Sequence, residues 1–356
     1  MASPRKRSAP EPVKSVVTIR DVAKEAGCSI TAVSWSINGN GTLSAETRSR
    51  VLAACKRLGY VTNSAGRNLR MKRSDTVGLL FPRSATTLFH NVFYADITAA
   101  FLDGLAINDL HLLICLYDPT DANFPVPAVI TQSRVDAAVV LGAAPQRFIE
   151  ALADYRVPLL LLDTGARGLE VDSVSSAGVA GATAAVEYLL SAGHRRLLMV
   201  IGDEEDANTN ERVTGFRTAL RKAGISSVGS APLAVSLCDF DQAYARLRQK
   251  LATMTLPVGV VMVNDTLAAQ MVRRLQVEGV RVPAEVSVVS FNDDNDARTC
   301  EPPLTTLAID RVALGRRGAE LIKARLDQPT RAVVHERLPM QLIERASVAR
   351  VNPARR

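Results

Sequence analysis

Apolar positions in the first sixty residues recur at the spacing of short amphipathic helices. In the first such segment they follow the i, i+3, i+4, i+7 pattern of one helix face. Thr18 and Asp21 form a capping-box pattern in front of that face. Ser29 and Ser44 are positioned to cap a second and a third helix. Two helices joined by a tight turn and followed by a third predict a helix-turn-helix domain.

From Asp75 onward the pattern changes, and short apolar runs alternate with helical segments. Runs as apolar as these are typical of strands buried on both faces and linked by crossover helices in a parallel sheet. The expected strands are Val77–Phe81, Leu112–Leu116, Ala137–Leu141, Leu159–Leu162, Leu197–Ile201, Val258–Val263 and Val286–Phe291. So many strands favour two doubly wound lobes rather than one. Because ligands bind beyond the carboxyl ends of parallel strands, a cleft between the lobes is expected.

These patterns divide the chain into four parts, the last of which has two lobes. The expected parts are residues 1–16, a disordered basic tail; 17–62, the helix-turn-helix domain; 63–74, a connecting segment; and 75–350, a two-lobed body. Its N-lobe is expected at about 75–174 and 307–335 and its C-lobe at about 175–306 and 336–350.

Charge is distributed unevenly along the chain. Residues 1–74 contain 14 Lys/Arg and 4 Asp/Glu, whereas the whole chain has a net charge of +7. The first part is therefore strongly basic and the rest slightly acidic, which is typical of a polyanion-binding module attached to another domain. A solvated basic tail is the alternative interpretation of charge alone.

Composition excludes several classes of protein. Hydrophobic residues make up 47% of the chain, yet no apolar run approaches the roughly 20 residues that span a bilayer. The first residues lack the apolar core of a signal peptide, so we expect a cytoplasmic protein without a membrane partner. The 5 cysteines are an odd number without metal-ligand spacing. A nucleophile elbow, a P-loop and a zinc motif are also missing, so neither an enzyme nor a cofactor or metal is expected.

The sequence resembles the lac-repressor (LacI/GalR) family from Val17 to Val348. The segments that carry the resemblance are Val17-Thr18-Ile19-Arg20-Asp21-Val22-Ala23-Lys24-Glu25-Ala26-Gly27-Cys28-Ser29, Ala32-Val33-Ser34, Ile37-Asn38-Gly39, Gly193-His194-Arg195, Gly215-Phe216-Arg217, Asn264-Asp265 and Pro302-Pro303-Leu304. The resemblance implies an all-α head and an α/β body like periplasmic binding proteins, with two doubly wound parallel-sheet lobes. It further implies a homodimer, or a dimer of dimers, that represses by occupying a palindromic operator. A small molecule, most often a sugar or related metabolite, would change the affinity for the operator. Because no C-terminal heptad run is visible, a dimer is favoured over a tetramer.

The resemblance places the start of the second helix in the major groove. The matching positions are Ile30, whose side chain can pack on a thymine methyl group, and Thr31, whose hydroxyl can hydrogen-bond a base. Trp35 stands one turn later, where the family commonly has Arg, and can pack on sugar or base edges; packing on its own domain is the alternative. The positions expected to contact phosphates or to cap helices are Thr18, Ser29, Ser34, Asn38 and Thr47.

The hinge matches the family at Asn63, Arg67 and Leu69, and the Leu is the residue that wedges into a minor-groove base step. Thr62 replaces the usual Pro, and Gly66 replaces the usual Ala. Glycine inside a helix costs about 0.5–1 kcal/mol relative to alanine. Since two turns of helix are unstable alone, the hinge is expected to fold only on DNA. A simple linker is the alternative.

For the effector, Arg212 matches the ligand-binding Arg of the family, with a salt bridge between lobes as the alternative. Asn264 and Asp265 match its Asn-Asp pair, although Asp265 can instead cap the helix that follows. Asn292 stands where the family usually has a sugar-binding Asp, and Phe89 matches an aromatic residue near the cleft.

The lobe crossover departs from the family at Ala177-Gly178, where an Asp-Asn pair is usual. Together with the amide at Asn292, this loss of polar groups argues against a standard sugar effector. A regulator that needs no effector, or one controlled by a protein partner, is the alternative function. A solute-binding protein without a DNA role is disfavoured by the head.

Overall fold

The computed structural model describes residues 17–38, 43–60, 73–83, 91–118, 121, 123–202, 206–225 and 232–351. The chain divides into two compact units, residues 1–72 and 73–356, which we call the head and the body. The predicted tail and almost all of the predicted hinge, with Asn63, Arg67 and Leu69, lie outside the described residues, as does Phe89.

The head consists of three short helices, α1 (Ile19–Ala26), α2 (Ile30–Asn38) and α3 (Ala45–Leu58). The caps predicted from the sequence are present. Asp21 accepts hydrogen bonds from the backbone and the hydroxyl of Thr18, Ser29 accepts from Ala32 N, and Ser44 accepts from Thr47 N. One small apolar core joins the helices; its fully buried members are Val22, Val33, Val51 and Ala54. The helix-turn-helix prediction is thus confirmed.

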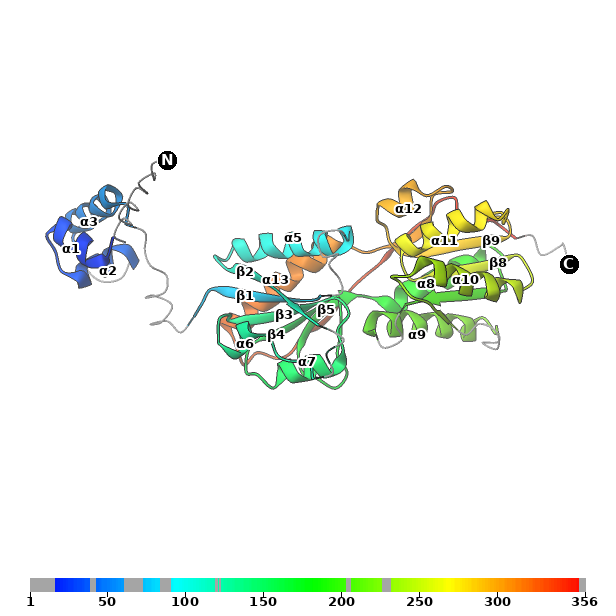
Figure 1. Ribbon diagram of the computed structural model, residues 1–356, viewed down its shortest axis with the longest axis horizontal. Coiled ribbons are helices and arrows are strands. Elements are labelled where there is room, and N and C mark those ends of the chain that lie inside the picture. Colours follow the sequence, from blue (N-terminus) through cyan, green and yellow to red (C-terminus); the bar gives the residue numbers. More distant parts are fainter. Residues whose placement is uncertain are drawn as a thin grey trace, which may run out of the picture. The chain divides into compact units, whose positions relative to one another are not determined.

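The N-lobe is a sheet of six described strands in the order β11-β5-β4-β3-β1-β2, all parallel. Its elements are β1 (Thr76–Pro82), α5 (Val92–Ala106), β2 (His111–Tyr117), α6 (Ala128–Thr131), β3 (Ala137–Leu141), α7 (Gln146–Ala153), β4 (Leu159–Leu162), β5 (Asp172–Ser176), α13 (Arg311–Asp327) and β11 (His335–Leu338). Helices α5 and α13 lie side by side on one face, and α6 and α7 cover the other (Figure 1).

The C-lobe is a second sheet of six described strands, in the order β12-β10-β9-β8-β6-β7. Its elements are α8 (Gly178–Ser191), β6 (Leu197–Ile201), α9 (Ala207–Lys222), β7 (Leu233–Ala234), α10 (Phe240–Ala252), β8 (Val258–Met262), α11 (Asp265–Val277), β9 (Val286–Asn292), α12 (Asn295–Thr299), β10 (Thr305–Ala308) and β12 (Gln341–Ile343). One apolar core lies under α8 and α9 and a second under α10 and α11. The predicted pair of parallel-sheet lobes is therefore confirmed, except that β12 runs antiparallel to β10.

The chain passes from one lobe to the other three times. It crosses between β5 and α8, between β10 and α13, and between β11 and β12. Each crossing lies a few residues later than the sequence predicted, because β5 and β11 continue to Ser176 and Leu338 in the N-lobe sheet and β10 continues to Ala308 in the C-lobe sheet.

Strand β2 differs from the expectation that strands as apolar as these are typically buried on both faces. It forms an edge of the N-lobe sheet, and Leu113, Ile114 and Leu116 are 38%, 38% and 48% exposed. An edge strand has a neighbouring strand on one side only. Its apolar sequence alone therefore cannot show whether other elements bury its side chains.

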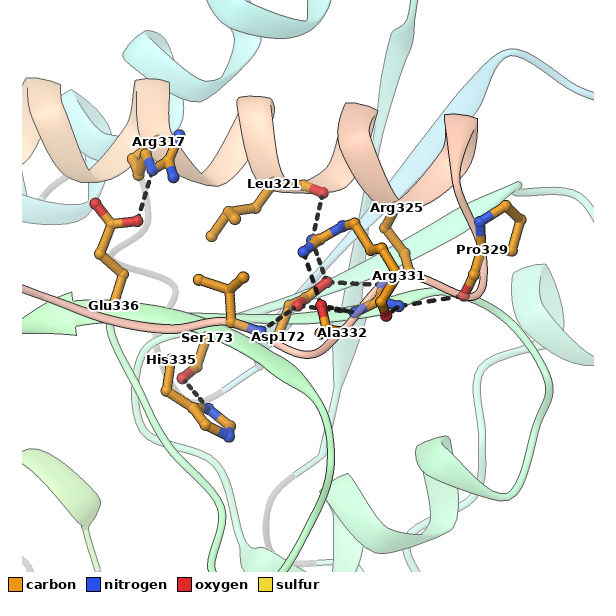
Figure 2. A network of polar contacts seen from close by, with 11 residues as sticks. Asp172, Ser173, Arg317, Leu321, Arg325, Pro329, Arg331, Ala332, His335 and Glu336 are labelled. Carbon is orange, nitrogen blue, oxygen red and sulfur yellow. Dashed lines mark hydrogen bonds and ion pairs between the residues drawn. The ribbon is translucent and has the colours of Figure 1, made fainter.

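A buried carboxylate fastens the end of α13 to the sheet. Asp172, at the start of β5, is 2% exposed and accepts hydrogen bonds from Arg325, Arg331 and the backbone N of Val334 (Figure 2). Because a buried charge is costly unless its acceptor sites are filled, this network holds the turn after α13 in one geometry.

Candidate DNA-binding surface and effector site

The second helix of the head presents one exposed face. Ile30 is 46% and Trp35 41% exposed, and Thr31 is exposed beside them. Thr31 and Trp35 are four residues apart, as are Ile30 and Ser34, so these four side chains lie along one stripe of α2. The side chain of Val33 points the other way into the core. The structure thus brings together the residues that were predicted to read bases.

The remaining head candidates lie at helix ends. Thr18 and Ser29 are exposed caps, and Thr47 lies in the first turn of α3, where its hydroxyl is 2.9 Å from that of Ser44. Asn38 ends α2. Backbone N–H groups at helix starts and small hydroxyl groups beside them are typical phosphate contacts, and that role stays a prediction here.

The body contains a cleft of about 2230 Å³ that both lobes line. Its N-lobe wall includes Tyr94 and Gln146, and its C-lobe wall includes Asp206, Asn264 and Asn292. The cleft is larger than the roughly 300–1,000 Å³ of an enclosed small-molecule pocket, as expected for a site open to solvent between two lobes. The cleft predicted from the ends of the strands is present.

Four polar side chains from both lobes converge at the cleft: Tyr94 and Asp206 line its wall, and Asp163 and Arg212 lie beneath it. Asp163 follows β4 and Tyr94 lies on α5 in the N-lobe, whereas Asp206 caps α9 and Arg212 lies within that helix. In the described body, Oδ1 of Asp163, Oδ1 of Asp206 and Nε of Arg212 have no hydrogen-bond partner. Burial raises the pKa of Asp163 to about 7, although the positive charge of Arg212 opposes that rise.

Arg212 is 7% exposed and lies beneath the surface of the cleft rather than on it. Its Nη1 donates to the carbonyl of Val263 at 2.6 Å, and its guanidinium carbon lies 4.5 Å from the centre of the Phe291 ring. It forms no ion pair with a carboxylate among the described residues, so the alternative of a salt bridge is not observed. Burial lowers the pKa of Arg212, while nearby Asp163 works against that change. A buried cation whose Nε has no hydrogen-bond partner in the described body is suited to a ligand acceptor.

The Asn-Asp pair of the C-lobe has two separate roles. Asn264 lines the cleft and caps α11 by accepting from Leu267 N at 2.8 Å. Asp265 is fully buried and accepts from Ser290 Oγ, from Thr306 Oγ1 at 2.8 Å and from Asp294 N at 2.9 Å. Its carboxylate therefore joins elements inside the C-lobe and does not line the cleft, and its predicted effector contact stays a prediction. Asn264, not Asp265, caps α11.

Asn292 lies on the cleft wall at the end of β9, with a φ of 112°. This left-handed backbone is strained for most side chains and is tolerated best by Asn, Asp and Gly. Burial raises the pKa of neighbouring Asp294, which also lines the cleft.

The departure from the family at the lobe crossover has a packing reason. A Cβ at Gly178 would lie 2.8 Å from Glu211 Cβ, and the Gly178 amide donates to Glu211 Oε2 at 3.2 Å. The same carboxylate pairs with Arg337 of β11 at 2.9 Å, so it joins α8, α9 and the N-lobe. The space that a side chain at 178 would need is occupied by Glu211.

Sequence reasoning missed Tyr94, Asp163, Asp206 and Glu211 as residues of the site. Asp163 was recognisable as a polar residue that directly follows a buried strand, and Asp206 as a capping residue before α9. Neither sequence feature indicates that these two carboxylates, which belong to different lobes, lie close together.

Two family models match the chain. Residues 18–63 match the bacterial regulatory proteins of the lacI family, and residues 186–348 match the periplasmic binding protein-like domain. In the part of the chain that the structure describes, no helix is long and apolar enough to cross a membrane.

A three-helix DNA-binding head followed by a two-lobed body with a polar cleft defines a class of ligand-responsive transcriptional regulators. The PurR transcriptional repressor of Yersinia enterocolitica is 30% identical over 344 residues, which is 94% of this chain and 97% of that one. The regulator DegA of Bacillus subtilis is 29% identical over 297 residues, covering 82% and 86%. The chain belongs to the LacI family of bacterial regulatory proteins.

Solved structures of similar fold agree. The lac repressor dimer bound to operator and the anti-inducer ONPF has a TM-score of 0.81 at 23% identity, over 94% of this chain and 99% of that one. The transcriptional regulator CelR in complex with cellobiose has a TM-score of 0.70 at 26% identity, over 93% and 99%. The protein is thus a DNA-binding transcriptional regulator with an effector-binding body.

Proposed function

We propose that this protein is a cytoplasmic repressor that occupies a palindromic operator as a homodimer. A neutral metabolite rich in hydroxyl groups, sugar-like or related, binds in the cleft and changes the affinity for DNA. The observation that carries this proposal is the set of buried, unpartnered polar atoms of Asp163, Asp206 and Arg212 at the cleft wall and directly beneath it.

The chemistry of the cleft favours a neutral ligand with several donors. Two of the unpartnered atoms are carboxylate oxygens, which accept from hydroxyl or N–H groups, and one is a guanidinium donor. The lining carries more negative than positive charge, which disfavours an anion. Its charged residues are the carboxylates Glu150, Asp206, Glu211, Asp294 and Asp296 and the arginines Arg147, Arg167 and Arg337. Neutral hydroxyl groups both donate and accept, so they satisfy both kinds of atom.

The homodimer is supported by the apolar edge of the N-lobe. Leu113, Ile114 and Leu116 of β2 are exposed together with Leu102 of α5. An exposed apolar edge strand is a liability in a monomer and a typical site of pairing with a second copy. The strongly basic segment up to residue 74 supplies the charge that DNA binding requires.

The DNA arm of this proposal is tested by selection. The full-length chain is incubated with a pool of random duplexes, bound duplexes are amplified over several rounds, and the enriched sequences are read. A palindrome is expected, with binding that weakens steeply as salt rises because phosphate contacts release counterions. Enrichment of no sequence would refute the operator part of the proposal.

The effector arm uses thermal shift with a panel of mono- and disaccharides, polyols, nucleobases and anionic sugar phosphates. A neutral polyhydroxy compound is expected to raise the melting temperature of the body and to change the affinity for the selected duplex. A shift by the sugar phosphates alone would contradict the charge argument. If the whole panel fails to change the affinity for the selected duplex, control by a protein partner replaces the small-molecule mechanism.

A further inference from the structure

The first residues of the body are fastened to the N-lobe by one carboxylate. Asp136 lies directly before β3, and Ser74 and Asp75 lie directly before β1. The carboxylate of Asp136 accepts from Ser74 N at 2.7 Å, from Asp75 N at 2.7 Å and from Ser74 Oγ at 2.9 Å. Two consecutive backbone amides are thus held by both oxygens of one side chain, as in a cap.

Two further contacts hold the same short segment. Arg73 Nη2 donates to the carbonyl of Leu326 in the last turn of α13 at 2.7 Å, and His111 N of β2 donates to Asp75 O at 2.8 Å. Asp75 has a φ of 51°, so the chain turns sharply there before β1 begins. The end of α13 is itself tied to β5 by the Asp172 network (Figure 2).

The side chain of Asp136 is not required to pair β1 with β3. The backbone N of Asp136 donates to Thr76 O at 2.8 Å, a bond that almost any residue at position 136 can make. The two strands then continue in register from Val77 with Ala137 to Leu80 with Val140. The carboxylate therefore adds order to residues 74 and 75, which precede the strand, rather than to the strand itself.

We propose that Asp136 is a positioning residue for DNA binding. Its carboxylate fixes the direction in which the polypeptide leaves the body toward the head. The inference rests on the proposed DNA binding by the head. A segment that is already ordered before the head binds its specific site loses less conformational entropy on binding.

The test compares Asp136→Ala and Asp136→Asn in the full-length chain. The control is Asp239→Ala, which also removes a carboxylate that accepts a backbone amide, Gln242 N at 3.0 Å at the start of α10 in the other lobe. Affinity is measured by fluorescence anisotropy for the duplex that the wild type selects from a random pool and for a scrambled duplex of the same length and composition.

Asp136→Ala is expected to weaken binding to the selected duplex about tenfold, while binding to the scrambled duplex changes less than about twofold. Asp136→Asn keeps one acceptor oxygen and should fall between the wild type and the alanine variant. Amide hydrogen exchange at Ser74 and Asp75 should become faster in both variants. The control should leave the ratio of the two affinities, and the exchange at Ser74 and Asp75, unchanged.

Equal affinities of wild type and Asp136→Ala for the selected duplex, with faster exchange at Ser74, would overturn the proposal. So would a parallel loss on both duplexes, or the same loss in the control, because each would indicate a general effect on folding. Should Asp136→Ala fail to fold, the same ratio of affinities is measured on Asp136→Asn, and an unchanged ratio there overturns the proposal. If the wild type selects no duplex, the proposed DNA binding itself is wrong. That outcome differs from one in which the wild type binds a duplex and the Asp136 contacts have no effect on the affinity.

Discussion

Asp163 is expected to lower the stability of the body as the pH rises, and its replacement by Asn should remove the part of the pH dependence that this residue contributes. The carboxyl group is 2% exposed, and burial raises its pKa from 3.8 to about 7. The folded protein therefore binds this proton more tightly than the unfolded chain does. At about 1.36 kcal/mol per pKa unit, the difference corresponds to about 4 kcal/mol, an upper value because a charged buried group relaxes its surroundings.

The direction of the effect follows from the raised pKa. The stability that the protonated group contributes is complete below about pH 4 and is lost as the pH rises through about 7. In Asp163→Asn the side chain does not titrate. Relative to the wild type, the variant should gain up to about 4 kcal/mol of unfolding free energy between pH 4 and pH 8. Asp265, whose pKa burial also raises to about 7, adds a pH dependence of the same sign to both proteins.

The assay is urea denaturation followed by far-ultraviolet circular dichroism at pH 5 and pH 8. Tryptophan fluorescence is unsuitable, because the single tryptophan, Trp35, reports on the head. Asp154→Asn, at an exposed carboxylate after α7, is the matched control and should follow the wild type at both pH values. If Asp163→Asn and the wild type lose the same stability between pH 5 and pH 8, the argument from burial is wrong.

Four other experiments test the remaining parts of the structure. Arg212→Met keeps the packing on Phe291 but loses the hydrogen-bond donors. The variant should bind the selected duplex normally, and calorimetry should show effector binding weakened by about 1.5–3 kcal/mol. An intact effector response would exclude Arg212 from the site. Gly315→Ala places a Cβ closer to the Ile97 carbonyl oxygen than van der Waals contact allows, so α13 and α5 must separate. Chemical denaturation should show an unfolding free energy lower by about 1–3 kcal/mol. Unchanged stability would refute the close contact. Trp35 emission should change on adding the selected duplex and stay constant on adding effector, and a spectrum unaffected by duplex would favour packing within the head. Ile114→Lys on the edge strand should yield monomers in analytical ultracentrifugation and weaken DNA binding, whereas a stable dimer would place the interface elsewhere.

Local pattern is sufficient to predict the head and most of the strands. Helix ends are specified by neighbouring residues, as with Thr18 and Asp21, so their caps can be found from sequence alone. Buried strands such as β3 and β8 have runs of apolar residues that identify them directly. Strand β5 is not predicted, because its sequence, Asp172 to Ser176, is mostly serine, yet it is fully buried between β4 and β11.

The convergence of side chains across the cleft could not be predicted, because it depends on packing between distant segments. The place of Asp265 after a strand predicts an effector contact, but Ser290 and Thr306, on two other strands, fill its acceptor sites. Conversely, Asp163 and Asp206 belong to different lobes, and only the packing of α9 beside the end of β4 brings them together. Asn208 Nδ2 makes that contact, donating to Asp163 O at 2.8 Å.

The three passages of the chain between the lobes have a consequence for protein synthesis. The N-lobe sheet begins with β1, but the helix that covers its face beside α5 and the strand that completes its edge, α13 and β11, are made only after the whole C-lobe up to β10. At roughly 5–20 residues per second, the ribosome needs on the order of ten seconds or more to pass from β5 to β11. Until α13 has been made, late in that interval, Phe101 and Ile97 of α5 lack the helix that buries them. A nascent chain stalled or truncated before Arg311 therefore exposes this apolar face, and such fragments should be substrates for chaperones and proteases rather than partially active regulators.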